Sequence, residues 1–229
     1  MSHAHNALVV GASRGLGLVL AAELARRGWH VVATTRRSGG PLQELADASA
    51  GRIRVETLEM TDVEQSLALR ERLSDTPVNL LFINAAIDRG DTAIEEVSTA
   101  TFVEVMVTNA LSPLRCLSVL HPLLTADGTV AVMSSEQGSV ALNTELGYEL
   151  YKASKAALNQ LVRSWYTRHV GDGHTILLLD PGHNRTGLGG PDAPLAPEES
   201  IPAVVDVVVK HGGTGGLLFL DRHGETVPW

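Results

Sequence analysis

The sequence predicts a single α/β domain over residues 1–229, built as a doubly wound parallel sheet of about seven strands with helices on both faces. Short apolar runs alternate with segments of helical periodicity along the whole chain, as in repeated strand–helix units. The first apolar run ends in a glycine-rich loop that leads directly into a helix. The chain is long enough for one large core, and no linker divides it.

The predicted strands are short and continuously apolar, which is typical of strands buried on both faces of a parallel sheet. They are assigned to residues 7–10, 30–35, 53–58, 78–83, 129–133, 174–179 and 217–220. Ligands of such sheets bind outside the carboxyl ends of the strands. Functional side chains are therefore expected in the loops that follow the strands.

The predicted helices are identified by apolar residues that recur every three or four positions. The first begins at Leu16 and ends before Gly28, and Asp62 is expected to cap the third. Pro113 is expected to bend the fourth. The helices are assigned to residues 16–27, 42–48, 63–73, 102–124, 153–169 and 202–210. A segment rich in Gly and Pro predicts a substrate-side loop within residues 184–200.

The composition excludes several classes of function. A net charge of -8 argues against nucleic acids and anionic membranes as main partners. No stretch approaches the roughly 18 apolar residues of a membrane span. The only cysteine, Cys116, permits no intrachain disulfide and is expected to be a buried thiol, so a cytoplasmic location is expected. His3 and His5 are too weak a signal for a metal site, and none is expected.

The loop after the first strand carries Gly11, Gly15 and Gly17 in the spacing G-x-x-x-G-x-G. Ordinary turns also contain glycines, so the spacing alone is a weak signal. Its position between an apolar strand and a helix that begins at Leu16 adds weight, because free backbone N–H groups at a helix start bind phosphate. The loop therefore predicts a dinucleotide site.

The end of the second strand indicates which dinucleotide binds. An acidic residue there would bind the ribose hydroxyls of NAD, but the chain has Thr35 followed by Arg36 and Arg37. A guanidinium binds a 2′-phosphate through charge-assisted hydrogen bonds, and Arg14 could reach the same group. NADP (NADPH) is therefore favoured, and NAD stays possible. The alternative is that Arg36 and Arg37 are solvated surface charges.

Tyr151 and Lys155 lie four residues apart, which places them on one helical face. A free phenol has a pKa of about 10, and a nearby ammonium favours the phenolate. The pair therefore suits an acid/base group for hydride transfer at a carbinol carbon. Ser135, at the end of the fifth strand, supplies a hydroxyl for the substrate oxygen. The alternative for an isolated Tyr–Lys pair is an exposed helical face.

With three further motifs, these residues resemble the short-chain dehydrogenase/reductases over nearly the whole chain. The further motifs are Asn84-Ala85-Ala86, Asn109 within residues 108–113, and Pro181-Gly182. The resemblance implies a Rossmann-type sheet and a catalytic tetrad of Asn109, Ser135, Tyr151 and Lys155. Tyr151 would be the acid/base and Ser135 would orient the substrate oxygen. Lys155 would lower the tyrosine pKa and bind the nicotinamide ribose, and Asn109 would hold a proton-relaying water.

The same resemblance implies the residues of the cofactor site. They would be Gly11, Ser13, Arg14, Leu16, Gly17, Arg36, Asp62, Asn84, Ala85, Tyr151, Lys155, Pro181, Gly182, Asn184 and Thr186. Asp62 would contact the adenine, and Asn84 and Ala85 would line the adenine-ribose side. Residues 181–186 would meet the carboxamide.

Residues 138–148 and 189–200 look like the branch of C-factor-like and sniffer-like carbonyl reductases. The gap between the serine and the tyrosine is a few residues longer than is usual in the family, which an insertion after Ser135 explains; Ser134 and Ser139 remain alternatives. Ala86 stands where the family usually has glycine. His183 either lines the substrate pocket or is a solvated loop residue.

The resemblance favours an NADPH-dependent oxidoreductase that reduces a small-molecule carbonyl compound or oxidises the corresponding alcohol. Two alternatives stay open. One is a dinucleotide-binding signalling or regulatory protein of the C-factor type, and the other is an epimerase or dehydratase on the same fold. A homodimer or homotetramer through residues 102–124 and 153–169 is implied by the resemblance only.

Overall fold

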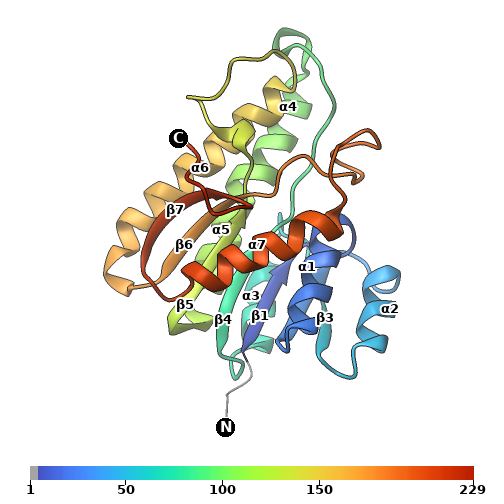
Figure 1. Ribbon diagram of the computed structural model, residues 1–229, viewed down its shortest axis with the longest axis vertical. Helices are drawn as coiled ribbons and strands as arrows, with labels where there is room; N and C mark the ends of the chain where they lie inside the picture. The colour runs from blue at the N-terminus through green and yellow to red at the C-terminus, as the bar shows by residue number, and fades with distance from the viewer. Residues whose placement is uncertain (1–4) are drawn as a thin grey trace.

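The computed structural model describes residues 5–229 and contains seven parallel strands in one sheet (Figure 1). The strands are β1 Asn6–Val10, β2 His30–Thr35, β3 Ile53–Thr57, β4 Val78–Ile83, β5 Leu124–Met133, β6 Thr175–Asp180 and β7 Gly216–Asp221. They are arranged in the order β3-β2-β1-β4-β5-β6-β7. The predicted sheet is therefore confirmed, and the direction of strand order reverses between β1 and β4.

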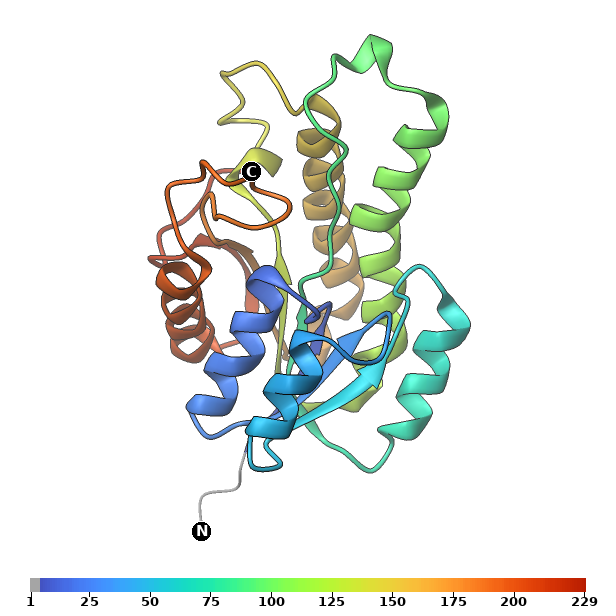
Figure 2. The same ribbon diagram turned by 90° about the vertical axis from the view of Figure 1, so that its right-hand side faces the viewer.

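The helices cover both faces of the sheet. They are α1 Gly15–Arg26, α2 Pro41–Ala48, α3 Val63–Arg72, α4 Thr99–Met106, α5 Ser112–Leu120, α6 Glu149–His169 and α7 Pro197–His211. Figure 2 shows α1, α2 and α7 on one face, and α3, α5 and α6 on the other. Along β1, Ala7 and Val9 pack into the first layer, while Leu8 and Val10 pack into the second. Burial on both faces explains why the strands are continuously apolar.

The long helix predicted over residues 102–124 is instead two helices joined by a π-helical turn, Val107–Leu111. The backbone N–H of Ser112 donates to the carbonyl oxygen of Val107, five residues back. Pro113 has no N–H, so the carbonyl group of Asn109 has no α-helical partner. The predicted bend at Pro113 is therefore a local change of helix type, and Asn109 lies at its centre.

The stretch Thr99–Leu123 is, within residues 5–229, the one helical segment long and apolar enough to cross a bilayer by composition, with a mean hydropathy of 1.3. No such segment was expected from the sequence. Half of its most apolar window is buried in the fold, and buried core helices meet the same criterion. Cys116 in this stretch is fully buried, and burial raises the pKa of its thiol to about 12, as expected for a structural cysteine.

Two other helices begin earlier than predicted. The α6 helix begins at Glu149 rather than at residue 153. The α7 helix begins at Pro197 rather than Pro202, because Pro197 occupies the first turn and Glu199 accepts a hydrogen bond from the backbone N–H of Ala196 at 2.6 Å. Asp62 caps α3 as predicted, accepting from the N–H groups of Glu64 and Gln65.

Candidate functional site

A cavity of about 310 Å³ lies at the carboxyl ends of the strands, the upper edge of the sheet in Figure 1. Its walls come from the loops after the first six strands and from the start of α6. The predicted residues that line it are Gly11, Ser13, Arg14, Leu16, Arg36, Asn84, Ala85, Ser135, Tyr151, Lys155, Pro181, Gly182, Asn184 and Thr186. Three predicted site residues do not line the cavity: Gly17, Asp62 and Asn109. The structure therefore gathers most of the predicted site residues in one place.

The glycine loop is shaped by contacts that leave no space for side chains. Gly11 has a φ of +87°, and a Cβ on it would lie 2.7 Å from the Cβ of Ala85. A Cβ on Gly17 would overlap the carbonyl oxygen of Gly11 and crowd the side-chain amide of Asn84. Gly17 therefore allows α1 to start against the loop, which is a packing role rather than a place in the cavity wall.

The start of α1 points free N–H groups at the cavity. Arg14 is the N-cap residue and its side chain makes no capping hydrogen bond. Gly15 and Leu16 line the cavity, and the first N–H groups of a helix have no intrahelical partner. Together with the positive end of the helix dipole, they form a cradle for an anion.

Asn84 is a structural link as well as a wall residue. Its side-chain amide donates to the carbonyl oxygen of Gly11 at 2.8 Å, and its backbone N–H donates to Val10 O at 3.0 Å. The end of β4 is thereby fixed to the glycine loop. Ala86, which replaces the usual glycine, lines the cavity and is not among the residues with positive φ, so its methyl group causes no backbone strain.

Tyr151 and Lys155 lie one turn apart near the start of α6 and both face the cavity. Lys155 is buried, and its Nζ donates to the carbonyl oxygen of Met133 at 2.9 Å. The same nitrogen lies 5.7 Å from the centre of the Tyr151 ring. The predicted common face is confirmed, and the alternative of an exposed helical face is wrong.

The pKa of the tyrosine departs from the expected direction. Burial raises the pKa of Tyr151, and the carboxylates of Asp180 and Asp88 act in the same sense. Lys155 was expected to lower it, but its ammonium is held by Met133 and is itself buried, which lowers the pKa of Lys155 to about 8. Desolvation is therefore the largest cause of both shifts. Tyr151 is protonated near neutral pH, the state of a proton donor.

The three candidate serines have different surroundings. Ser135 lines the cavity and is partly exposed, and its hydroxyl accepts from the N–H of Gln137 at 3.2 Å. Ser134 also lines the cavity, but it is buried and its hydroxyl donates to Asn159 at 2.5 Å. Ser139 is buried and accepts from the N–H of Leu142. Ser135 is thus the serine whose hydroxyl is available to a ligand, as the insertion argument requires.

Asn109 is buried in the π-helical turn and does not reach the cavity. Its amide donates to the carbonyl oxygen of Ile87 at 2.7 Å and to the hydroxyl of Ser154 at 3.0 Å. Its side-chain oxygen accepts from the N–H of Ile87 at 2.8 Å. The side chain therefore fixes the loop after β4 against α6, next to Lys155.

Asp180, the last residue of β6, is a cavity residue that the sequence analysis did not select. It is buried, and its carboxylate accepts from the N–H groups of Glu136 and Gly182 at 2.9 and 3.0 Å. Burial raises the pKa of Asp180. It joins the loops after β5 and β6 beside the tyrosine. A carboxylate at the end of an otherwise apolar strand is the signal that could have identified it.

The loop after β6 folds over the glycine loop. A Cβ on Gly15 would touch the methyl group of Thr186 at 3.4 Å. Asn184 is buried; its amide donates to the carbonyl oxygens of Pro181 and Gly182, while its Oδ1 has no hydrogen-bond partner among residues 5–229. An unpaired buried oxygen at a cavity wall is suited to accept from a ligand. His183 lines the cavity, and its Nε2 donates to Gly189 O at 2.7 Å.

Arg36 lines the cavity at the end of β2, and Glu59 lies beside it. The guanidinium is 3.7 Å from the Glu59 carboxylate, and both side chains are partly exposed. Arg37 does not line the cavity. The sequence analysis did not foresee Glu59, because it follows a different strand. Arg36 can therefore meet an anion, although a neighbouring carboxylate competes for it.

Asp62 does not line the cavity, and its carboxylate is engaged within its own helix. One oxygen accepts from Glu64 N and Gln65 N, and the other accepts from the Gln65 side chain at 3.0 Å. The structure therefore shows Asp62 as the N-cap of α3, close to Leu58, Glu59 and Met60 of the cavity wall, and its contact with adenine stays a prediction.

Known proteins with this fold and sequence are similar over most of the chain. The model of the family described as short chain dehydrogenase matches residues 5–193. A solved structure from Burkholderia multivorans, assigned to the short-chain dehydrogenase/reductases and holding NADP, is 48% identical, with a TM-score of 0.97 over 99% of this chain and 100% of that one.

Two further relatives are informative. The carbonyl reductase of Pseudomonas aeruginosa PAO1 in complex with NADP is 37% identical, with a TM-score of 0.91 over 99% of this chain and 100% of that one. The C-signal of Myxococcus xanthus is 37% identical over 159 residues, which are 67% of this chain and 93% of the relative. These similarities confirm the resemblance inferred from the motifs, including its C-factor-like branch.

The buried ammonium of Lys155 predicts a pH-dependent stability. Burial lowers its pKa in the folded state from 10.5 to about 8. Between these values the unfolded chain binds more protons, so the free energy of unfolding rises with pH. We expect the free energy of unfolding of the parent protein to rise by up to about 2 kcal/mol between about pH 8 and pH 9.5, measured by urea denaturation. The Lys155→Met variant should lack this rise. Lys152→Met, on the exposed side, is the control, and an unchanged slope in the Lys155 variant would contradict the prediction.

Proposed function

Because the chain belongs to the short-chain dehydrogenase/reductase family and is an oxidoreductase, we propose that it is an NADPH-dependent carbonyl reductase. The observation that carries this proposal is the meeting of Tyr151, Lys155 and Ser135 with the free start of α1 in one cavity. One end of the cavity can hold an anion, and the other presents a phenol and a hydroxyl to a carbonyl oxygen. The two ends fit a dinucleotide and a small substrate side by side.

NADP fits the groups that the cavity offers. The free N–H groups of α1 suit the pyrophosphate, and Arg14 and Arg36 suit the 2′-phosphate. The unpaired Oδ1 of Asn184 suits the carboxamide of the nicotinamide. When bound, the cofactor supplies the hydride. The NADP held by relatives from Burkholderia multivorans and Pseudomonas aeruginosa supports the same choice.

Tyr151 acts as the general acid in this proposal. The raised pKa keeps its phenol protonated, so it can donate to the carbonyl oxygen as negative charge develops there. Ser135 donates a second hydrogen bond that orients the same oxygen. Lys155, with a pKa of about 8, is the nearby ammonium from which the phenol can regain its proton.

Asn109 is a positioning residue in the same proposal. Its side chain is fully engaged with Ile87 and Ser154, so it acts by fixing the loop after β4 against α6. Its carbonyl group, which lacks an α-helical donor because residue 113 is proline, is the group that suits a water between the helix and Lys155. That water is part of the proposal.

The substrate side of the cavity is lined by Tyr148, His183 and Leu188, all from segments that resemble the carbonyl reductase branch or adjoin it. Tyr148 and Leu188 are partly exposed. An aromatic and an aliphatic side chain beside one imidazole suit an apolar carbonyl compound rather than a charged one.

The proposal also includes a cytoplasmic location. It further includes a homodimer or homotetramer, which is supported by the exposed apolar side chains of Phe102, Val103 and Leu161 on α4 and α6.

A signalling role is the second candidate function, favoured by the similarity to C-signal. A protein that only senses a dinucleotide needs neither a proton donor nor a substrate hydroxyl. The presence of both Tyr151 and Ser135 in the cavity wall therefore favours the enzyme. Tight NADPH binding without turnover of any carbonyl compound would favour the signalling role instead.

The first test of the enzyme is a panel of aldehydes and ketones assayed by NADPH oxidation, with Tyr151→Phe as the variant. Removing only the phenolic oxygen removes the proton donor, so we expect kcat to fall at least about a hundredfold. The NADPH Kd and the Tm should stay close to the parent values. Turnover of the variant within a few-fold of the parent would rule out Tyr151 as the acid.

The second test compares the three serines. Ser135→Ala should lower kcat by about a hundredfold or more, because the substrate oxygen loses an orienting hydrogen bond in the transition state. Ser134→Ala and Ser139→Ala should mainly lower Tm, since their hydroxyls bond within the core and the following loop. If Ser139→Ala proved to be the variant with the catalytic defect, the insertion after Ser135 would be misplaced.

The third test concerns cofactor selection. Arg36→Ala should weaken NADPH binding by about tenfold and leave NADH binding unchanged, since an exposed charge pair contributes little beyond this. Glu59→Gln should strengthen NADPH binding by a few-fold, because it removes a carboxylate that competes with the phosphate. Arg37→Ala is the control, and the readout is the Kd of each cofactor. Equal affinity of the parent protein for NADH and NADPH would refute the role of Arg36.

A further inference from the structure

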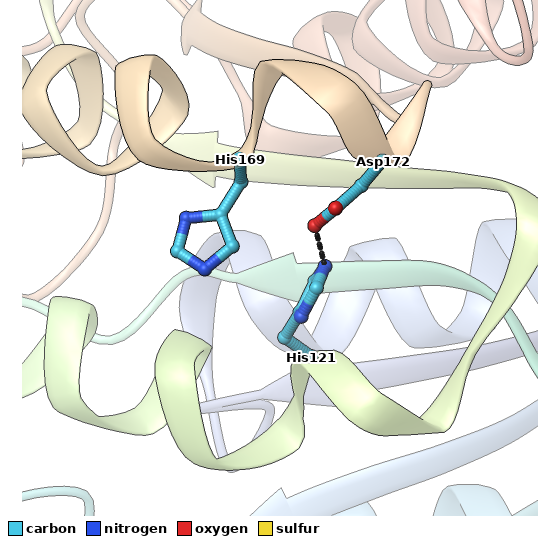
Figure 3. A group of neighbouring side chains, drawn as sticks. All are labelled: His121, His169 and Asp172. Carbon is cyan, nitrogen blue, oxygen red and sulfur yellow. Dashed lines mark ion pairs between the residues drawn. The ribbon is translucent and has the colours of Figure 1, made fainter.

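Four polar side chains meet at the amino-terminal edge of the sheet, opposite the cavity. His121 follows α5, His169 ends α6, Asp172 lies in the turn after α6, and His174 precedes β6. Three potential metal-binding atoms lie within 4.8 Å of one another, one each from His121, His169 and Asp172. Figure 3 shows these three side chains converging, with Asp172 directed at the ring of His121.

Backbone carbonyl groups determine which nitrogen carries hydrogen in two of the rings. A carbonyl oxygen can only accept, so His169 Nδ1–H donates to Trp165 O at 2.8 Å and His174 Nε2–H donates to Thr125 O at 3.0 Å. In the neutral rings, His169 Nε2 and His174 Nδ1 are left with free lone pairs. Metal-binding histidines are oriented in the same way, by a carbonyl group at the far nitrogen.

His121 lies between these lone pairs and the carboxylate. Its Nε2 is 3.2 Å from His174 Nδ1 and 3.3 Å from Asp172 Oδ2. Donors around a four-coordinate zinc ion with bonds of about 2.1 Å are about 3.4 Å apart. Both separations therefore already fit a tetrahedral set.

We propose that this cluster binds a divalent transition-metal ion of the Zn²⁺ class through His121 Nε2, His169 Nε2 and one carboxylate oxygen of Asp172. His174 Nδ1 lies 3.2 Å from His121 Nε2 and outside this set of three. Imidazole nitrogens with one carboxylate suit Zn²⁺ and its transition-metal neighbours, whereas Mg²⁺ and Ca²⁺ prefer oxygen ligands. When the ion binds, the proton on His121 Nε2 moves to Nδ1 of the same ring or to solvent.

The role of the ion is structural. It connects the end of α5, the end of α6 and the turn that leads into β6, all on one face of the sheet. The cavity lies beyond the opposite ends of the strands, so the ion takes no part in the proposed reaction. Trp165 provides a local probe, because its indole stacks on the His169 ring with centroids 3.9 Å apart and meets the His121 ring edge-on at 5.0 Å.

The test is a Zn²⁺ titration by calorimetry on chelator-treated, tag-free protein. The protein carries His3→Ala and His5→Ala, so that the amino-terminal histidines cannot contribute. We expect a single equivalent of Zn²⁺ with a micromolar or tighter Kd, and a rise of several degrees in Tm at saturating Zn²⁺. Co²⁺ should quench the emission of Trp165 at the same stoichiometry.

Two ligand variants and one control keep the test decisive. Asp172→Asn and His169→Gln each remove one ligand, so each should weaken Zn²⁺ binding at least about tenfold and abolish the rise in Tm. Asp172 is exposed, so the Asp172→Asn variant should fold normally. This holds even if His169→Gln is destabilised by the loss of the imidazole that stacks on Trp165. His30→Gln, an exposed histidine at the same sheet edge, should bind like the parent. No Zn²⁺ uptake by the parent, or uptake unchanged in both ligand variants, would overturn the proposal.

Discussion

The whole site depends on one close approach between backbones, where the glycine loop meets the end of β4. The Asn84 amide bonds to the carbonyl oxygen of Gly11, and neither Gly11 nor Gly17 has room for a Cβ. Strand order reverses at this point of the sheet, so the helices that follow β1 and β4 pack on opposite faces and leave a crevice between them. Any side chain at Gly17 would push α1 away from the loop, and the N–H groups at its start would no longer face the cavity.

A second set of contacts carries this placement to the catalytic groups. Asn109 connects Ile87, just beyond Asn84, with Ser154, whose hydroxyl donates to the carbonyl oxygen of Tyr151. Lys155 bonds to Met133 at the end of β5. Nearly every polar atom in this network is satisfied within the protein, which makes its geometry rigid. The unpaired Oδ1 of Asn184 stands out against that background.

Sequence reasoning predicted the sheet, six helical regions and a set of site residues most of which line the cavity, because apolar periodicity and glycine spacing are local signals. It preferred Ser135 to Ser139 because the resembling branch has an insertion after the serine, and Ser139 is buried. What it missed depends on contacts between distant segments. Glu59 beside Arg36, the carboxylate of Asp180 and the cluster around His121 arise only when separate strand ends are brought together.

Two errors have a different origin. The π-helical turn could not be read from periodicity, because it adds one residue to a helix whose apolar pattern otherwise continues. The pKa of Tyr151 could not be inferred from the spacing to Lys155, because the spacing contains no information on desolvation. Burial around the pair decides the direction, and burial is a property of the assembled loops.

The π-helical turn also sets a limit on how this chain can change. The wide turn takes up one extra residue, so that α5 keeps Cys116, Leu117 and Leu120 in the core. Deleting a residue from Val107–Leu111 would restore regular α-helical bonding there and turn Asn109 away from Ile87. The polar network is thus tied to one extra residue, so length variation should be rare here even among relatives whose loops differ freely.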